Sequence, residues 1–153
     1  INLFEDSEFE INIVGSGTKK HNLIELAKQK NVKANFLGRL ENEDLQKLYD
    51  KYLFFVSTSK FEGNPKSVLE AMSRGCVVIA SNIENHSELI TDEQNGYLIP
   101  DNCFSLSSFI NSLLQNEKKL IDVSLNSREY VIKNNNINNL CEFEYNDFKE
   151  LKN

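Results

Sequence analysis

The chain has 153 residues, of which 40% are hydrophobic, so it is long enough to bury one core and short for two. Its formal net charge is −6, and it has no basic block or basic amphipathic helix, which argues against binding to nucleic acids or anionic membranes. Because it also lacks an apolar stretch of about 18 residues and a signal-peptide core, we expect one cytoplasmic domain over residues 1–153 without membrane contact of its own.

Strands and helices are predicted to alternate from the start of the chain. The short, β-branched segment Glu10–Val14 predicts a strand, and the turn Gly15-Ser-Gly17 ends it. Apolar residues then recur at helical spacing over residues 23–27. A second apolar segment, residues 32–37, ends at Gly38, and residues 42–49 predict a capped amphipathic helix. The order of strand, turn and helix therefore occurs twice.

The same order continues through the middle of the chain. Residues 53–57 and 76–80 are continuous apolar runs, typical of strands buried on both faces of a parallel sheet. A helix is predicted between them, from about Pro65 to Arg74. A short helix at residues 88–90, a turn at Asn95-Gly96 and a strand at Tyr97–Ile99 follow. Three further helices are expected after Pro100, over residues 104–114, 120–132 and 140–151.

This alternation predicts an α/β fold with right-handed crossovers, a doubly wound, Rossmann-like parallel sheet and extra C-terminal helices. Turns beginning at Gly15, Gly38, Ser57 and Ser81 follow predicted strands. Because the carboxyl ends of parallel strands share one edge, and such sheets bind ligands there, we expect these turns to surround the ligand site.

The turn before the third predicted helix gives the strongest functional signal. Gly63, Asn64 and Pro65 stop the preceding strand, and Pro65 suits the first helical position, where no amide hydrogen is needed. The opening N–H groups, from Lys66 and Ser67 onward, have no intrahelical partner. Together with the helix dipole they predict a site for a phosphate-like anion.

Two carboxylates flank this turn. Glu62 lies just outside the helix and Glu70 one to two turns inside it, so a nucleotide sugar, with phosphate in the middle and hydroxyls at both ends, would match the whole arrangement. Glu70 has mostly apolar neighbours, and we expect it to need a partner, because an unpaired buried carboxylate is costly. In the structural alternative, neither carboxylate binds a ligand. Glu70 then pairs with a backbone amide or a lysine, and Glu62 interacts with the helix dipole or with amides.

The remaining candidates carry weaker signals. Gly15 and Gly17 resemble the start of a dinucleotide fingerprint, but the third glycine is missing, so a tight turn and a ligand-facing loop both stay open. His86 is expected to be a surface loop histidine. The cations near these turns are expected to be solvated by default, although any could reach a diphosphate; they are Lys19, Arg39, Lys60 and Lys66.

The three cysteines, Cys76, Cys103 and Cys141, are widely spaced and include no Cys-x-x-Cys pair. Only two histidines accompany them as other soft ligands. We therefore expect neither a disulfide framework nor a metal site. Small buried or half-buried hydrophobes are the favoured interpretation of these cysteines, and a reactive thiol is the alternative.

Taken together, five segments closely resemble, in order, the C-terminal, nucleotide-sugar-binding domain of glycosyltransferase family 4, within the GT-B superfamily. The segments are residues 13–17, 36–38, 62–72, 75–80 and 95–99. The series covers nearly the whole chain and includes the two glutamates of the family. The resemblance implies a retaining, metal-independent enzyme without cofactor, with two Rossmann-like domains facing a cleft and an acceptor-binding N-terminal domain outside these residues.

By position, the resemblance implies that Glu62 and Glu70 are the catalytic pair. Glu62 would hold hydroxyls of the donor sugar, and Glu70 would accept hydrogen bonds from the ribose. Gly38 and Arg39 match the turn that meets the nucleobase, and Gly15 matches the first loop at the donor cleft. The full set of implied donor-binding residues is Gly15, Gly17, Gly38, Arg39, Gly63, Asn64, Pro65, Lys66, Ser67 and Val68.

Two departures from the family pattern affect the donor site. Pro65 stands where many members have glycine, which removes one amide donor. The diphosphate-binding arginine and lysine of the family normally lie just before the strand with which this chain begins. We therefore expect this chain alone to bind donor weakly and to transfer nothing.

The expected function is the donor-binding half of a retaining glycosyltransferase that moves a sugar, favoured as UDP-linked, to a glycan or lipid-linked acceptor in bacterial cell-surface polysaccharide synthesis. The parent protein is expected at the inner face of the cell membrane as a peripheral protein. Alternatives are a sugar-nucleotide epimerase, a starch or glycogen type synthase, or a non-catalytic doubly wound interaction module. A receiver-like module would need a cluster of acids at the strand ends, where Asn12, Asn35, Ser57 and Asn82 stand instead.

Overall fold

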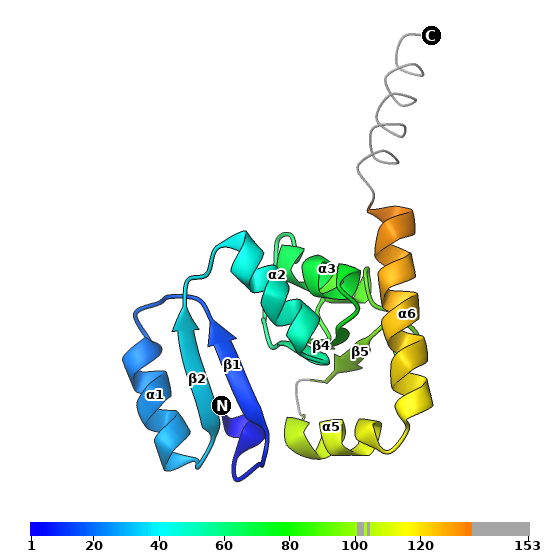
Figure 1. Cartoon of the computed structure of the whole chain (residues 1–153). Helices are drawn as coiled ribbons and strands as arrows, with labels where there is room; N and C mark the ends of the chain where they lie inside the picture. Colours follow the sequence, from blue (N-terminus) through cyan, green and yellow to red (C-terminus); the bar gives the residue numbers. More distant parts are fainter. Residues whose placement is uncertain (101–102, 104, 136–153) are drawn as a thin grey trace.

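The computed structural model describes residues 1–100, 103 and 105–135 (Figure 1). Its elements in chain order are η1 (Asn2–Phe4), β1 (Glu10–Val14), α1 (Lys20–Gln29), β2 (Lys33–Gly38), α2 (Asn42–Lys51), β3 (Phe54–Ser57), α3 (Lys66–Ser73), β4 (Val77–Ser81), α4 (Glu84–Ser87), β5 (Tyr97–Ile99), α5 (Leu106–Leu114) and α6 (Glu117–Asn134). The helix expected over residues 140–151 lies outside the described residues. None of the described helices is both long and apolar enough to cross a membrane.

The described strands form two parallel ladders. β1 pairs with β2, with Ile11 opposite Ala34, and β4 lies between β3 and β5, with Phe54 opposite Val77. Together with the helices that connect the strands, this confirms the α/β fold with parallel strands. Within residues 1–100 no ladder joins β1 to β3, so the sheet is divided between these two strands.

The core lies on the two faces of β4, whose residues 77–80 are all fully buried. Val77 and Ile79 belong to a cluster with residues of η1, α5 and α6, whereas Val78 and Ala80 belong to a second cluster with residues of α3. Successive side chains of a strand point to opposite faces, so β4 supplies both clusters in alternation. The two-sided burial expected of this strand is therefore confirmed.

Helix boundaries differ from the sequence expectation at three points. Pro65 precedes α3 as its N-cap rather than occupying the first helical position, and its φ and ψ are −79° and 59°. The short helix α4 ends before residue 88, because Leu89 and Ile90 donate back to the carbonyl of His86 and close the turn there. α6 begins before residue 120, because the side chain of Asn116 accepts the N–H of Lys119 and caps the helix.

We predict that Gly96→Ala lowers the free energy of unfolding by about 1–3 kcal/mol, the usual cost of overpacking a core. A Cβ at Gly96 would lie 3.0 Å from Ile90 Cγ2 and 3.2 Å from the carbonyl oxygen of Val78, which belongs to the backbone of β4. Urea denaturation followed by circular dichroism measures the change. Gly63→Ala is the control, because a Cβ there meets nothing within 4 Å; equal losses in the two variants would contradict the prediction.

Candidate functional site

The glycine turns of the first ladder lie side by side at its carboxyl edge. The N–H of Gly15 donates to the carbonyl of Gly38 at 2.7 Å, and the φ angles of these glycines are 127° and 74°. Residues with a Cβ are strained in this region, so the backbone itself requires glycine at both positions. A Cβ at Gly15, Gly17 or Gly38 would meet nothing within 4 Å, so the turns also border open space.

Arg39 follows these turns directly, and its side chain is exposed. No hydrogen bond or ion pair joins its guanidinium to the described part of the chain. A bound ligand at this edge of the sheet would therefore find Arg39 without a competing carboxylate.

Backbone carbonyls of the preceding turn already accept several of the N–H groups at the amino end of α3. The carbonyl of Pro65 accepts the N–H groups of Val68 and Leu69 at 3.0 and 3.1 Å, and the N–H of Lys66 donates to the carbonyl of Asn64 at 2.8 Å. The expectation that the Lys66 amide is free for an anion is therefore wrong, because the tight turn at Asn64 uses it. Val68 is 1% exposed and packs in the core, so its side chain does not reach a ligand.

Other N–H groups of this turn remain available. Those of Gly63, Asn64 and Ser67 have no acceptor among the residues that the structure describes. All three residues are exposed, and Ser67 opens onto a cavity of about 710 Å³. The donor set that this turn offers to a phosphate or sugar oxygen therefore comes from these three residues.

Glu62 lies at the edge of the same cavity and is half-buried. Its Oε1 accepts the hydroxyl of Ser59 at 2.7 Å, and the carbonyl of Ser59 in turn accepts the hydroxyl of Ser81 at the end of β4. In the described residues Glu62 forms no ion pair. A neutral hydroxyl therefore holds the carboxylate in place, and no described cation competes with a ligand for it.

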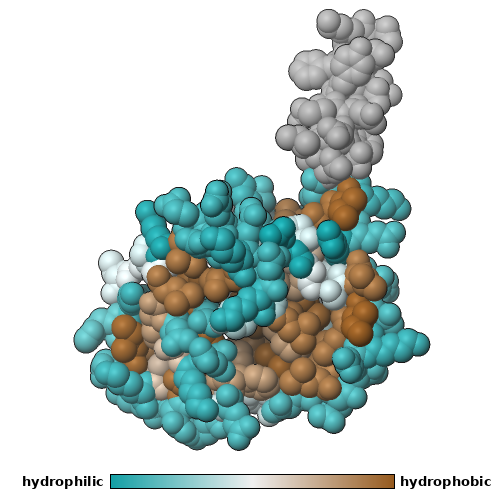
Figure 2. Space-filling model, viewed as in Figure 1, coloured by the Kyte–Doolittle hydropathy of each residue, from teal (hydrophilic) through white to brown (hydrophobic). Residues whose placement is uncertain are grey.

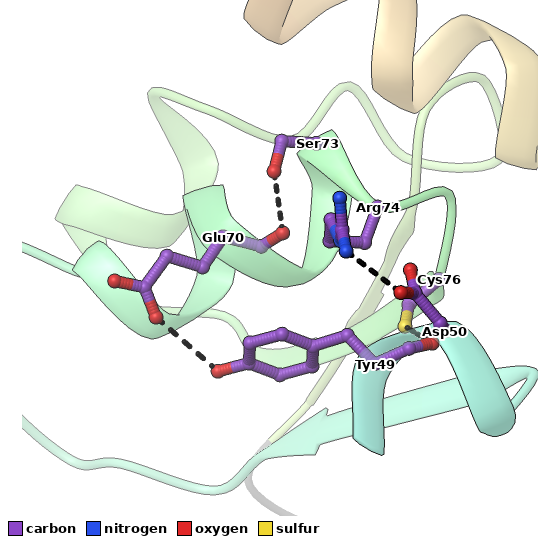
Figure 3. A network of polar contacts seen from close by, with 6 residues as sticks. All are labelled: Tyr49, Asp50, Glu70, Ser73, Arg74 and Cys76. Atoms are coloured by element: carbon purple, nitrogen blue, oxygen red, sulfur yellow. Dashed lines mark hydrogen bonds and ion pairs between the residues drawn. The ribbon is translucent and has the colours of Figure 1, made fainter. Parts of the chain in front are cut away.

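Glu70 is exposed, so the expectation that it is a buried carboxylate is wrong. Val68, Ala71 and Met72 form the buried face of α3, and the helical period places Glu70 outside that face. Its Oε2 lies 3.4 Å from the hydroxyl of Tyr49, which comes from α2 (Figure 3). Burial, and then the charge of Glu70, raise the pKa of the Tyr49 phenol, so the phenol stays protonated and can donate to the carboxylate.

Two further contacts hold α2 against the end of α3 beside this pair (Figure 3). Arg74 and Asp50 form an ion pair at 2.7 Å, and the thiol of Cys76 lies 3.3 Å from the carbonyl of Tyr49. These contacts fix the backbone that carries Tyr49, and so place its hydroxyl at Glu70.

Cys76 is 2% exposed, which confirms its interpretation as a small buried hydrophobe. Burial, and then the charge of Asp50, raise the pKa of the Cys76 thiol to about 11, so the thiol is protonated and unreactive at neutral pH. Cys103 is half-buried and free, and Cys141 lies outside the described residues. Across residues 1–100, 103 and 105–135, no group of three or more His, Cys, Asp and Glu side chains could hold a metal ion.

His86 is fully buried, so the expectation of a surface histidine is wrong. Its Nδ1 lies 2.8 Å from the carbonyl oxygen of Ser81, so Nδ1 carries the hydrogen and donates it. Its Nε2 lies 3.5 Å from the hydroxyl of Ser57. Because Ser57 ends β3 and Ser81 ends β4, His86 joins the carboxyl end of the strand that precedes the Glu62 turn to the carboxyl end of β4.

Asn85 is a second contact between α4 and the Glu62 turn, because its Nδ2 donates to the carbonyl of Gly63 at 3.2 Å. Neither Asn85 nor Ser59 was predicted from the sequence as a site residue. The available signal was their position, since both follow predicted strands at the expected ligand edge. The structure therefore brings the Glu62 turn and α4 together, and leaves Glu70 on a separate contact with α2.

Comparison with known proteins identifies relatives across most of the chain. The model of the family "Glycosyl transferases group 1" matches residues 2–136. The chain is 34% identical over 139 residues to the Escherichia coli UDP-Gal:α-D-GlcNAc-diphosphoundecaprenol α-1,3-galactosyltransferase, covering 89% of this chain and 35% of that protein. It is 28% identical over 140 residues to the poly(ribitol-phosphate) α-N-acetylglucosaminyltransferase of Staphylococcus aureus (strain COL), covering 90% of this chain and 28% of that protein. It thus spans about a third of the length of these curated relatives.

Solved structures share the fold. The crystal structure of TarM, a Staphylococcus aureus protein, has a TM-score of 0.80 at 28% identity, covering 92% of this chain and 29% of that chain. The Anabaena protein HepE, solved in complex with UDP-glucose, has a TM-score of 0.81 at 19% identity, covering 92% of this chain and 41% of that chain. The similarity to HepE shows a shared fold alone.

We predict that His86→Leu lowers the free energy of unfolding by about 1–3 kcal/mol, because it leaves the half-buried Ser81 carbonyl and Ser57 hydroxyl without their partner. Chemical denaturation measures the loss. His21→Leu is the matched control, since His21 is exposed and its replacement should change the stability by less than about 0.5 kcal/mol. An unchanged free energy of unfolding in His86→Leu would show that the imidazole does not hold the strand ends together.

Proposed function

We propose that this chain, which belongs to the glycosyl transferases group 1 family, is the donor-binding half of a retaining, metal-independent glycosyltransferase. The enzyme would move a sugar from a nucleoside diphosphate sugar, UDP-linked by preference, to a glycan or lipid-linked acceptor. The observation that carries the proposal is the Glu62 turn. There, among the described residues, a half-buried carboxylate has no ion pair and adjoins N–H groups of Gly63, Asn64 and Ser67 that have no acceptor.

The proposed chemistry divides between the carboxylate and the amides. Glu62 accepts hydrogen bonds from hydroxyls of the donor sugar, and charge-assisted bonds of this kind select stereochemistry. The N–H groups of Gly63, Asn64 and Ser67 stabilise the departing nucleoside diphosphate, whose negative charge grows as the glycosidic bond loosens. In the proposal they take the place of a divalent metal.

The nucleoside end of the donor would lie against the other two parts of the site. Glu70 accepts hydrogen bonds from the ribose, and the Tyr49 hydroxyl orients its carboxylate from the opposite side. Gly38 and Arg39 meet the nucleobase, and Gly15 with Gly17 borders the phosphates. The open space beside these glycines leaves room for the donor to approach the backbone.

The proposed pathway is bacterial cell-surface polysaccharide synthesis. It is supported by the names of two relatives, which act on poly(ribitol-phosphate) and on a diphosphoundecaprenol-linked sugar. UDP as carrier is supported by the UDP-Gal donor of the Escherichia coli relative and by the complex of TarM with UDP. The parent protein would work as a peripheral protein at the inner face of the membrane, where lipid-linked acceptors are exposed.

The proposal assigns acceptor binding to polypeptide outside residues 1–153, because the curated relatives are about three times as long as the matched part. A separate acceptor-binding domain would close over the Glu62 turn. The same outer polypeptide would supply the diphosphate-binding arginine and lysine implied by the family resemblance. Residues 1–153 then form one domain of a two-domain enzyme.

We predict that UDP binds to the protein and that Glu70→Ala weakens this binding by about 1–3 kcal/mol, the range for losing a charged hydrogen-bond partner. Calorimetric titration with UDP measures the change. Glu129→Ala, which removes an exposed carboxylate from α6 that does not line the cavity, should leave the affinity unchanged. Equal affinity of the wild type and Glu70→Ala for UDP would contradict the proposal that Glu70 binds the ribose.

We also predict that residues 1–153 alone release no nucleoside diphosphate from a UDP-sugar in an acceptor-dependent way, because the acceptor would bind elsewhere. A coupled assay for UDP, run with and without a lipid-linked saccharide, measures the release. The complete gene product is the positive control. Acceptor-dependent turnover by residues 1–153 would refute the proposal that the acceptor binds outside these residues.

A further inference from the structure

The turn that carries Glu62 is attached to the rest of the fold on both sides of this residue. On one side, the hydroxyl of Ser81 donates to the carbonyl of Ser59. On the other side, the Nδ2 group of Asn85 donates to the carbonyl of Gly63 at 3.2 Å. Ser81 ends β4 and Asn85 lies in α4, so adjoining elements hold the backbone before and after Glu62.

The carboxylate of Glu62 is held by a separate bond. The hydroxyl of Ser59 donates to its Oε1 at 2.7 Å, and no described residue donates to its Oε2. The last torsion of a glutamate side chain has a broad distribution, so without this bond the plane of the carboxylate could turn. An ionised carboxylate has about four acceptor positions, and the Ser59 hydroxyl occupies one of them. Ser59 therefore sets the directions in which the other acceptor positions point.

The surroundings of this bond are polar, although most of the cavity is not. Beyond the apolar residues of β3, the cavity is lined by Ser57, Thr58, Ser59 and Glu62. Figure 2 shows apolar side chains exposed across the middle of the molecule, framed by hydrophilic ones. Lys60 and Phe61 lie between Ser59 and Glu62 in sequence, but they are exposed and do not line the cavity. The turn thus brings the serine hydroxyl and the carboxylate to the cavity together.

We propose that Ser59 is a positioning residue that makes the donor site selective for the configuration of one sugar hydroxyl. Epimeric sugars differ only in the direction of a single hydroxyl, as glucose and galactose do at carbon 4. A carboxylate in a fixed plane binds one epimer better than the other, because hydrogen bonds weaken steeply away from their preferred angles. A carboxylate that can turn follows either hydroxyl. This role rests on the proposed function, because it places the donor sugar at Glu62.

A hydroxyl is suited to this role because it carries no charge. Lys60, the nearest cation in sequence, forms no ion pair with Glu62 within the described part of the chain. The carboxylate is therefore not neutralised by a neighbour, and charge-assisted hydrogen bonds are roughly twice as strong as neutral ones. A sugar hydroxyl would meet a charged acceptor in a fixed direction.

Three variants separate this role from a structural one. Ser59→Ala removes the bond to the carboxylate but leaves the contacts of Ser81 and Asn85, which end on backbone carbonyls. Ser59→Thr keeps the hydroxyl and is the conservative variant. Ser112→Ala is the matched control, because the Ser112 hydroxyl donates to the carbonyl of Phe109 on α5 and the residue does not line the cavity.

Each variant is made in the complete gene product and titrated by calorimetry with UDP and with UDP-sugars. The sugars are glucose, galactose, N-acetylglucosamine and N-acetylgalactosamine. The UDP-sugar that the wild type binds most tightly is then compared with its epimers at carbons 2, 3 and 4. The measured quantity is the largest ratio of dissociation constants between epimers. UDP itself reports binding of the nucleotide without the sugar.

In Ser59→Ala this ratio should fall about tenfold, the effect of one hydrogen bond to a charged group, while the affinity for UDP stays within about twofold. Ser59→Thr and Ser112→Ala should keep the wild-type ratio. Equal weakening of UDP and of every UDP-sugar in Ser59→Ala would indicate a purely structural role and overturn the proposal.

Three other results would also count against it. An unchanged ratio in Ser59→Ala, or an equal loss in Ser59→Ala and Ser59→Thr, would show that the hydroxyl does not set the selectivity. Equal binding of all epimers by the wild type would overturn the proposal in the same way. Failure of the wild type to bind UDP or any UDP-sugar would instead contradict the proposed function, and the role of Ser59 would fall with it.

Discussion

The two-sided burial of β4 is the constraint on which the other elements depend. Four successive residues without exposed surface, 77–80, place side chains alternately into the core beneath α5 and α6 and into the core beneath α3. Burial of apolar surface stabilises a fold by about 25 cal/mol per Å², so displacing this strand would be costly. β3 and β5 take their registers from it, and the turns at the carboxyl ends of β3 and β4 are therefore fixed relative to each other.

The candidate donor site uses this rigidity through polar contacts rather than through packing. His86 connects the ends of β3 and β4, Ser81 holds the backbone at Ser59, and Ser59 holds the carboxylate of Glu62. Together these contacts connect the carboxyl ends of β3 and β4 to the Glu62 carboxylate. A carboxylate held by supporting hydrogen bonds keeps its geometry better than one on a free loop, which is what binding of a particular sugar would require.

The sequence predicted most of the elements and the turns at the carboxyl ends of the strands, because apolar runs and glycine turns are local signals. It misjudged the exposure of single side chains, since exposure depends on the neighbours that the fold brings. Glu70 has apolar neighbours in sequence but points away from the buried face of α3, and His86 follows a loop in sequence but is enclosed by the strand ends. The division of the sheet was also unpredictable, because strand patterns say that a segment is extended and not which strands it pairs with.

The divided sheet bears directly on donor binding. The first glycine turn follows β1 and the Glu62 turn follows β3, so the two sides of the proposed donor site belong to ladders that share no backbone hydrogen bond in the described residues. A displacement of about 1 Å between binding groups can cost a hundredfold in the activity of a site. The relative position of the two ladders therefore decides whether the two sides of the proposed donor site can bind one molecule together.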